Sequence, residues 1–185
     1  TRCGRFMGAL TGAQRMLMTD ELELRHKHLG HPFQMISESE QSEEIGAGRY
    51  VGGALIPDLG SIHPGLYHLG LLNAARSVSA RIIGYTPVTA VRSDGAEFQV
   101  DTPRGVLTAR DVIVATNGYT NCGVPWLRRR VIPFHGYMIA TDILSEDVIT
   151  QILPNNRTFH DYNNNLVYIR QAPDQPRLLM GAYTG

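Results

Sequence analysis

Cysteine is scarce in this sequence. Among 185 residues only Cys3 and Cys122 are cysteines, and they stand far apart without a C-x-x-C spacing. Such a pair argues against a disulfide scaffold and against a zinc site, and it is typical of a protein from a reducing compartment. We therefore expect a cytoplasmic protein that binds no metal ion.

The sequence also lacks an excess of positive or negative charge. Seventeen Lys and Arg residues balance seventeen Asp and Glu residues, so no net field attracts nucleic acid or an acidic membrane surface. No apolar run approaches the roughly 20 residues that a membrane-spanning helix needs. The opening TRCGRFMGAL lacks the basic start and the apolar run of a signal peptide. Neither nucleic acid nor a membrane is expected as a partner.

The glycine fingerprint G-x-G-x-x-G of a dinucleotide site is also missing. The nearest segment, GAGRYVGG at 46–53, has the spacing G-x-G-x-x-x-G and follows the residues SEEI at 42–45. A fingerprint needs a buried strand before it, so that a helix N-terminus meets the pyrophosphate. These residues do not form such a strand. The segment therefore predicts a flexible turn before a strand.

Two polar clusters carry little chemistry. His26, His28 and His31 could be assembled into a metal site, but ligand pairs on a helix stand four residues apart, and positions two apart point to different faces. A solvated polar face is the better interpretation. The acidic stretch SESEQSEE at 37–44 is interpreted as a solvated loop or an exposed helix face.

Helices are predicted where apolar residues repeat with a period near 3.6. The first covers residues 12–29. The second begins at Ser61 as N-cap, has Pro64 in its first turn, and shows one apolar face over residues 61–81. A short helix runs from Ser145, its N-cap, to Leu153.

Elsewhere the period drops to two. Three strands at 88–92, 97–102 and 106–109 form a meander, since Asp94-Gly95 is a strong hairpin turn. The continuous apolar run DVIVAT at 111–116 is typical of a strand buried on both faces of a parallel sheet. Further strands are expected at 131–141, 165–170 and 177–181.

The turn VATNGYT follows the run at 111–116. Open α/β sheets bind ligands at the carboxyl ends of their strands, and the small residues Ala115, Thr116 and Gly118 permit close approach to a ligand. An ordinary strand exit with an Asn-Gly turn accounts for the pattern equally well. The two interpretations stay open on this motif alone.

A resemblance extends over nearly the whole chain. GGALIPDLGSIHPGLYHLGLLNAARSVSARIIGYTPVTAV, then the meander, ARDVIVATNGYT, RRRVIPFHGYMIAT and LVYIRQAPDQPRLLMGAYTG follow one another as in the middle of FAD-dependent oxidoreductases of the D-amino-acid-oxidase type. The chain is most similar to the branch with gamma-glutamylputrescine oxidase and glycine oxidase. The resemblance implies a mixed α/β fold, in which part of a Rossmann-like FAD domain is interleaved with an antiparallel-sheet substrate domain.

The same resemblance implies domains and site residues. Residues 61–125 would belong to the FAD domain, and 1–60 and 126–185 mainly to the substrate domain. Four residues match positions that contact the cofactor: Val88, Ala115, Thr116 and Asn117. Arg170 resembles the arginine that pairs with a substrate carboxylate, and Tyr168 would line the same pocket. Arg170 is equally well interpreted as a solvated strand residue.

The implied reaction is the oxidation of an amine or amino acid by FAD, with release of peroxide. His135 could face the flavin, although a hydrogen-bonded structural histidine is the simpler interpretation. The family's N-terminal G-x-G-x-x-G segment and C-terminal segment are not in this sequence, so we expect a fragment that alone binds FAD weakly or not at all. A flavin dehydrogenase with another electron acceptor and a non-catalytic binding module are the alternatives.

Overall fold

The computed structural model describes residues 2–164 and 166–183. Asn165, the first residue of the strand predicted at 165–170, lies outside this range. The chain forms two compact units: Thr1–Tyr67 together with His135–Gly185, and His68–Phe134. We describe each unit by itself.

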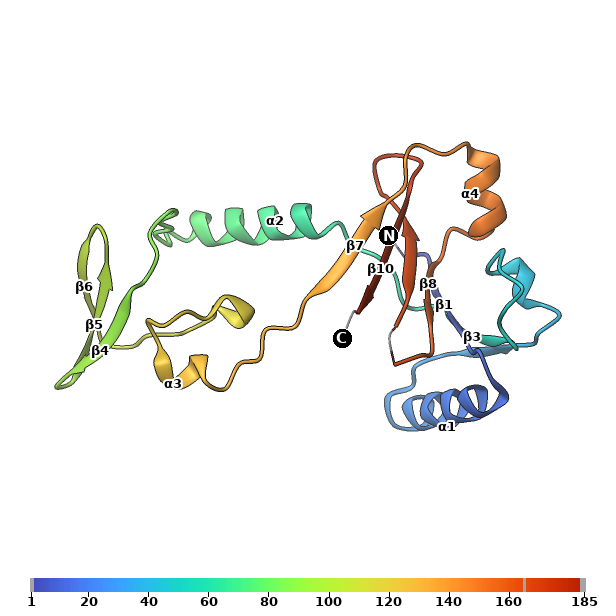
Figure 1. Ribbon diagram of the computed structural model, residues 1–185, viewed down its shortest axis with the longest axis horizontal. Coiled ribbons are helices and arrows are strands. Elements are labelled where there is room, and N and C mark those ends of the chain that lie inside the picture. Colours follow the sequence, from blue (N-terminus) through green and yellow to red (C-terminus); the bar gives the residue numbers. More distant parts are fainter. Residues whose placement is uncertain (1, 165, 184–185) are drawn as a thin grey trace. The chain divides into compact units, whose positions relative to one another are not determined.

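The first unit is built on a seven-stranded sheet with the order β2-β3-β1-β8-β9-β10-β7 (Figure 1). Only β1 and β8 run parallel within the described residues; the other neighbouring strands are antiparallel. The fold is therefore mixed α/β with a mainly antiparallel sheet, as the sequence predicts. The strands are β1 (Arg5–Gly8), β2 (Gln34–Ile36), β3 (Gly53–Ile56), β7 (Gly136–Ala140), β8 (Thr158–Asp161), β9 (Tyr168–Gln171) and β10 (Leu178–Tyr183).

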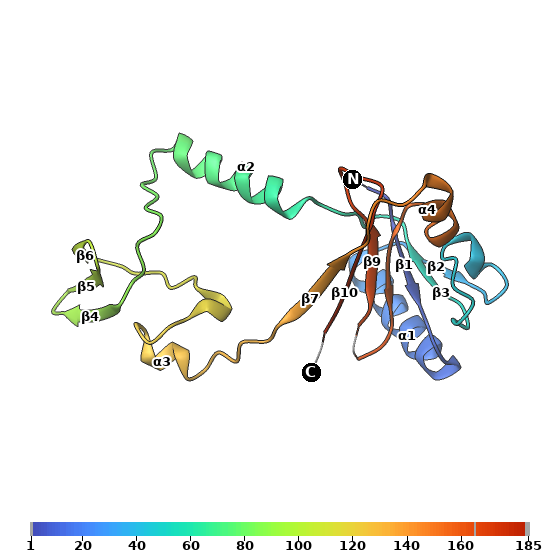
Figure 2. The same ribbon diagram turned by 45° about the horizontal axis from the view of Figure 1, so that its top comes forward.

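Two helices cover this sheet. Helix α1 (Gly12–Leu29) packs through Met18 and Leu22 onto Met7 of β1 and its neighbours. Figure 2 shows this helix beside the sheet. A second core contains Phe6, Phe159 and Leu153, the last of which follows α4 (Glu146–Ile152). In its strand, Phe6 is adjacent to Met7 of the first core. Because successive side chains of a strand point to opposite faces, the two cores lie on opposite faces of the sheet.

Local signals place both helices as predicted. The Thr11 side chain accepts a hydrogen bond from the Gln14 N–H (3.2 Å), and Gly30 ends α1 in the left-handed conformation at φ 69°. Ser145 caps α4 in the same way, through the Val148 N–H. Both caps satisfy backbone groups that a helix end leaves unpaired.

The glycine segment at 46–53 is a turn before β3, as predicted, but it is tightly packed rather than flexible. The Gly46 N–H donates to the Ile152 carbonyl (3.0 Å), and a Cβ on Gly46 would come within 1.8 Å of the Gln151 oxygen. A Cβ on Gly53 would lie 2.0 Å from the Met7 oxygen. These glycines allow backbones to approach each other.

The prediction of a solvated segment at 37–44 is wrong for two residues in the C-terminal half of the segment. Gln41, in the 3-10 helix η1 (Gln41–Glu43), and Glu44 are buried. The Glu44 carboxylate pairs with the Arg157 guanidinium at 2.7 Å. A charged residue is buried here because a partner more than a hundred positions away neutralises it, and a local pattern does not reveal such a partner.

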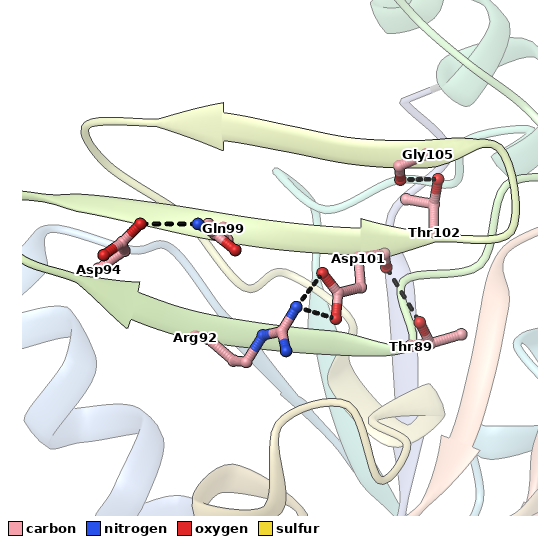
Figure 3. Close-up of polar contacts among 7 residues, drawn as sticks. All are labelled: Thr89, Arg92, Asp94, Gln99, Asp101, Thr102 and Gly105. Atoms are coloured by element: carbon pink, nitrogen blue, oxygen red, sulfur yellow. Dashed lines mark hydrogen bonds and ion pairs between the residues drawn. The ribbon is translucent and has the colours of Figure 1, made fainter.

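The second unit contains the predicted meander: β4 (Ala90–Asp94), β5 (Glu97–Thr102) and β6 (Gly105–Ala109), with the order β4-β5-β6. Figure 3 shows the polar pairs between its strands, such as Arg92 with Asp101 at 2.7 Å and Gln99 with Asp94 at 2.6 Å. Cross-strand pairs of this kind stabilise the chosen register. The first strand begins two residues later than the prediction of 88–92.

The prediction of a buried parallel strand at 111–116 is wrong for this structure. These residues form no strand, and Ile113 is 92% exposed. A parallel strand needs neighbours on both sides to pair its backbone groups, and the described part of the unit places none there. The unit also contains the 3-10 helix η2 (Asn117–Tyr119) and α3 (Pro125–Arg128).

Helix α2 (Pro64–Ser77) crosses the division between the units. It is shorter than the predicted 61–81, and its apolar face is not buried: Leu66 is 64% and Leu71 54% exposed. The strand predicted at 131–141 is also shorter, since β7 covers only 136–140. Among the described residues, no helix is both long and apolar enough to cross a membrane.

Candidate functional site

The two predicted catalytic residues share one face of one strand. Tyr168 and Arg170 lie two positions apart on β9, so their side chains point to the same side of the sheet. Both line a cavity of about 570 Å³ in the first unit, which we call the sheet-face cavity. Its volume is within the range of small-molecule sites.

The strand register builds the floor of this cavity in two rows. Arg5 of β1 is the partner of Thr158 of β8. Phe159 pairs with Ile169, so the same register continued by one residue sets Thr158 opposite Arg170, whose partner on β10 is Leu179. The second row contains His160, its partner Tyr168 and then Gly181.

Arg170 is not a freely solvated strand residue. One Nη donates a hydrogen bond to the Ile62 carbonyl (2.8 Å), in the segment before α2 that borders the cavity. Within the described residues Arg170 pairs with no carboxylate. Its remaining N–H groups are therefore free of protein anions.

Gly181 makes room for the predicted Tyr168. A Cβ at position 181 would lie 2.2 Å from the Tyr168 ring, so only glycine lets the ring lie across β10. His160 and Arg5, which line the cavity, and Gly181 beneath the Tyr168 ring are residues that the sequence interpretation missed. The only sequence signal is alternation in strands of four residues, which is too short to define a face.

His160 lies in the second row, and burial favours the neutral form of its imidazole. Its Nδ1 is 3.0 Å from the Asp161 carbonyl oxygen; because a carbonyl only accepts, Nδ1 carries the hydrogen and Nε2 is the acceptor. Burial lowers the pKa of His160 below its ordinary value of 6.5, and the positive charge of Arg5 lowers it further. The hydrogen bond to Asp161 and the negative charges of Asp161 and Glu21 act in the opposite direction.

This histidine predicts a pH dependence of stability. The pKa of His160 is lower in the folded state than in the unfolded state, so the unfolded state binds its proton first as the pH falls. The contribution of His160 to stability is therefore fully present above its ordinary pKa and declines as the pH falls below that value. We expect the melting temperature to fall less between about pH 7.5 and about pH 5 for His160→Gln than for the unchanged protein. His28→Gln, at an exposed position of α1, should leave the profile as it is; an equal change in both variants would contradict the assignment.

A second cavity lies in the other unit. It has a volume of about 350 Å³, its walls are mainly apolar with valine the commonest residue, and we call it the meander cavity. Three of the four predicted cofactor contacts line it: Val88, Ala115 and Thr116. Asn117 is not among the lining residues.

The turn after Thr116 is tightly bonded. The hydroxyls of Thr116 and Thr120 lie 2.8 Å apart, and the Thr120 hydroxyl donates to the Asn117 carbonyl (2.7 Å). Asn117 has φ 47°, a left-handed conformation that asparagine tolerates better than most residues. The Val88 carbonyl already accepts a hydrogen bond from the Asn121 amide (3.1 Å).

The remaining histidine predictions have simple outcomes. His26, His28 and His31 are exposed, as expected. His135 is exposed as well and makes no hydrogen bond to another described residue, so the interpretation as a hydrogen-bonded structural histidine is wrong. No three His, Cys, Asp or Glu side chains of residues 2–164 and 166–183 are grouped so that they could hold a metal ion.

Two curated proteins are similar to this chain over part of their length. The probable oxidoreductase OrdL of Haemophilus influenzae is 30% identical over 174 residues, which are 89% of this chain and 40% of the relative. Gamma-glutamylputrescine oxidoreductase of Escherichia coli is 30% identical over 181 residues, 97% of this chain and 42% of the relative. The chain thus spans about two fifths of these relatives.

Solved structures share the fold. Glycine oxidase from Geobacillus kaustophilus matches with a TM-score of 0.74 and 22% identity, over 100% of this chain and 48% of that chain. L-proline dehydrogenase from P. horikoshii matches with a TM-score of 0.79 and 17% identity, over 97% of this chain and 48% of that chain. The family model described as FAD dependent oxidoreductase (DAO) matches residues 1–184. The chain therefore belongs to the DAO family of FAD-dependent oxidoreductases.

Proposed function

We propose that the chain is part of an FAD-dependent oxidoreductase that oxidises the C–N bond of an amine or amino acid. The family match supports the cofactor and the reaction class. The observation that carries the substrate class is the sheet-face cavity, because Tyr168 and Arg170 share its floor and no Asp or Glu lines it. In the complete protein, residues 1–60 and 126–185 would belong mainly to the substrate domain, and 61–125 to the FAD domain.

In the proposed reaction a hydride leaves the carbon beside a neutral nitrogen, whose lone pair forms the C=N bond of an imine. Water then hydrolyses the imine to a carbonyl compound and the released amine. FAD, when bound, supplies the acceptor for the hydride, and oxygen would take up the two electrons as peroxide. This chain orients the substrate: the planar guanidinium of Arg170 suits bidentate pairing with a carboxylate, and Tyr168 limits the space beside it.

The meander cavity fits a part of FAD. Its mainly apolar walls suit a flat apolar ring system, and Ala115 and Thr116 leave space at one side. Its volume of about 350 Å³ is at the lower end of ligand sites, and FAD is larger than one such site holds. The described residues contain no G-x-G-x-x-G helix start for the pyrophosphate. We therefore assign Val88, Ala115 and Thr116 to the adenosine end. Asn117 is assigned to it only by the resemblance, and we expect weak FAD binding by this chain alone.

The flavin proposal is tested by the visible absorption spectrum of the complete protein. Anaerobic addition of amines and amino acids should bleach the flavin bands with at least one compound. Ala115→Leu places extra volume in the wall of the meander cavity and should weaken FAD binding by about tenfold, since overpacking costs roughly 1–3 kcal/mol. Ala96→Leu, at the exposed hairpin turn of the same unit, is the matched control. A protein that stays colourless with added FAD would contradict the proposal.

A dehydrogenase with another electron acceptor is the second candidate. The fold similarity to L-proline dehydrogenase is as strong as that to glycine oxidase, so the fold does not separate the two. Peroxide release during turnover in air identifies an oxidase. Turnover that requires an added acceptor and yields no peroxide identifies a dehydrogenase.

A further inference from the structure

We propose that Arg5 forms a second anion subsite in the sheet-face cavity, so that the preferred substrate carries a second carboxylate besides the one that pairs with Arg170. The inference deepens the proposed function and rests on it for the oxidation itself. The binding of a dianionic ligand, however, follows from the cavity alone.

The register places the two guanidiniums over one surface. Arg5, Thr158 and Arg170 form one row on one face of adjacent strands β1, β8 and β9. Neighbouring strands lie about 4.8 Å apart, so the two arginine Cα atoms are separated by roughly 10 Å. Thr158 between them has a short side chain whose hydroxyl is bonded to the Gly4 carbonyl (3.3 Å). Nothing long stands between the two arginines in this row.

Neither arginine forms an ion pair within the described part of the chain. The residues that line the sheet-face cavity include both arginines and no Asp or Glu. Within the described residues, Arg5 makes no ion pair or hydrogen bond through its side chain. Both side chains are partly buried. Two like charges that are partly buried beside one cavity repel each other, and an anionic ligand offsets this cost.

Two carboxylates that border the other cavity of Arg5 are engaged elsewhere. Arg5 also borders a neighbouring cavity that contains Glu21, but Glu21 pairs with Arg25 and accepts a hydrogen bond from the Tyr162 hydroxyl (2.9 Å). Asp161 is buried and accepts from the Val167 N–H (2.8 Å). The two arginines are the permanently charged residues that line the sheet-face cavity.

Two carboxylates suit this arrangement better than one. A guanidinium presents parallel N–H groups that match a single carboxylate, and Arg170 already fixes one of its nitrogens on the Ile62 carbonyl. With roughly 10 Å between the two Cα atoms, each arginine can hold its own carboxylate at opposite ends of a ligand a few carbons long. The cavity of about 570 Å³ accommodates such a chain.

The test is equilibrium binding to the complete protein, measured by calorimetry with ligands that cannot be oxidised at a C–N bond. Succinate, glutarate and adipate are compared with butyrate. At least one dicarboxylate should bind about tenfold more tightly than butyrate, which corresponds to roughly 1.4 kcal/mol. Arg5→Gln should remove this preference and leave the butyrate affinity within about twofold. Arg170→Gln should weaken both classes.

Arg49→Gln is the matched control, because Arg49 is exposed in the same unit and lines neither of the two cavities that Arg5 borders. It should change neither affinity, and circular dichroism verifies that each variant is folded. Arg5→Lys should restore part of the preference, since it keeps the charge without the planar fork. A preference that survives Arg5→Gln, or a protein that binds no dicarboxylate better than butyrate, would overturn the inference. Dicarboxylate binding by a protein without flavin would overturn only the proposed reaction.

Discussion

Replacing Arg157 by methionine is expected to lower the free energy of unfolding by about 3 kcal/mol, because the change leaves a buried carboxylate without its partner. The Glu44 side chain is only 8% exposed, and its Oε2 lies 2.7 Å from Arg157 Nε. The Arg157 guanidinium also donates a hydrogen bond to the Cys3 carbonyl oxygen (3.5 Å). Urea unfolding followed by circular dichroism measures the loss.

The chain offers a matched control for this pair. Arg25 and Glu21 form an ion pair on α1 whose side chains are 51% and 39% exposed, and exposed pairs contribute only about 0–1 kcal/mol. Arg25→Met should therefore change stability by less than about 1 kcal/mol. The double variant Arg157→Met/Glu44→Met should lose less than Arg157→Met alone, because no charge stays unpaired. Equal losses for Arg157→Met and Arg25→Met would show that burial of Glu44 does not matter.

Replacing Gly46 by alanine is expected to cost about 3 kcal/mol, at the upper end of overpacking effects. The new Cβ would lie 1.8 Å from the Gln151 carbonyl oxygen and 2.9 Å from its carbon, so backbone rather than a flexible side chain must shift. The hydrogen bond from the Gly46 N–H to the Ile152 carbonyl would be disturbed as well. Thermal unfolding of the variant measures the effect.

Gly48 lies two positions further in the same glycine segment and is the control. A Cβ at Gly48 would meet nothing within 4 Å, so Gly48→Ala should be neutral or stabilise by about 0.4–1 kcal/mol through the unfolded state. The contrast separates a packing role of this segment from a nucleotide-binding role. If Gly46→Ala left stability unchanged but weakened FAD binding, the packing interpretation would be wrong.

The sequence by itself determined the elements whose signals are local. Helix α1 has the predicted bounds because Thr11 caps its start and Gly30 its end. The meander forms because Asp94-Gly95 fixes a hairpin and its strands alternate. The order of motifs along the chain was also sufficient to identify the family. Each of these signals depends on residues close to one another or on their order.

Only the tertiary structure decided the features that depend on distant residues. Residues 111–116 have the pattern of a buried strand, yet they form none, because a strand requires neighbours that the pattern does not supply. Glu44 is buried because Arg157 approaches it from far along the chain. Arg5 lies in one row with Arg170 because β1 pairs with β8 and β8 with β9. Strand register sets which side chains share a face of the sheet. A shift by one residue would move every side chain of a strand to the opposite face. The floor of the sheet-face cavity is therefore a property of the fold and not of any short motif.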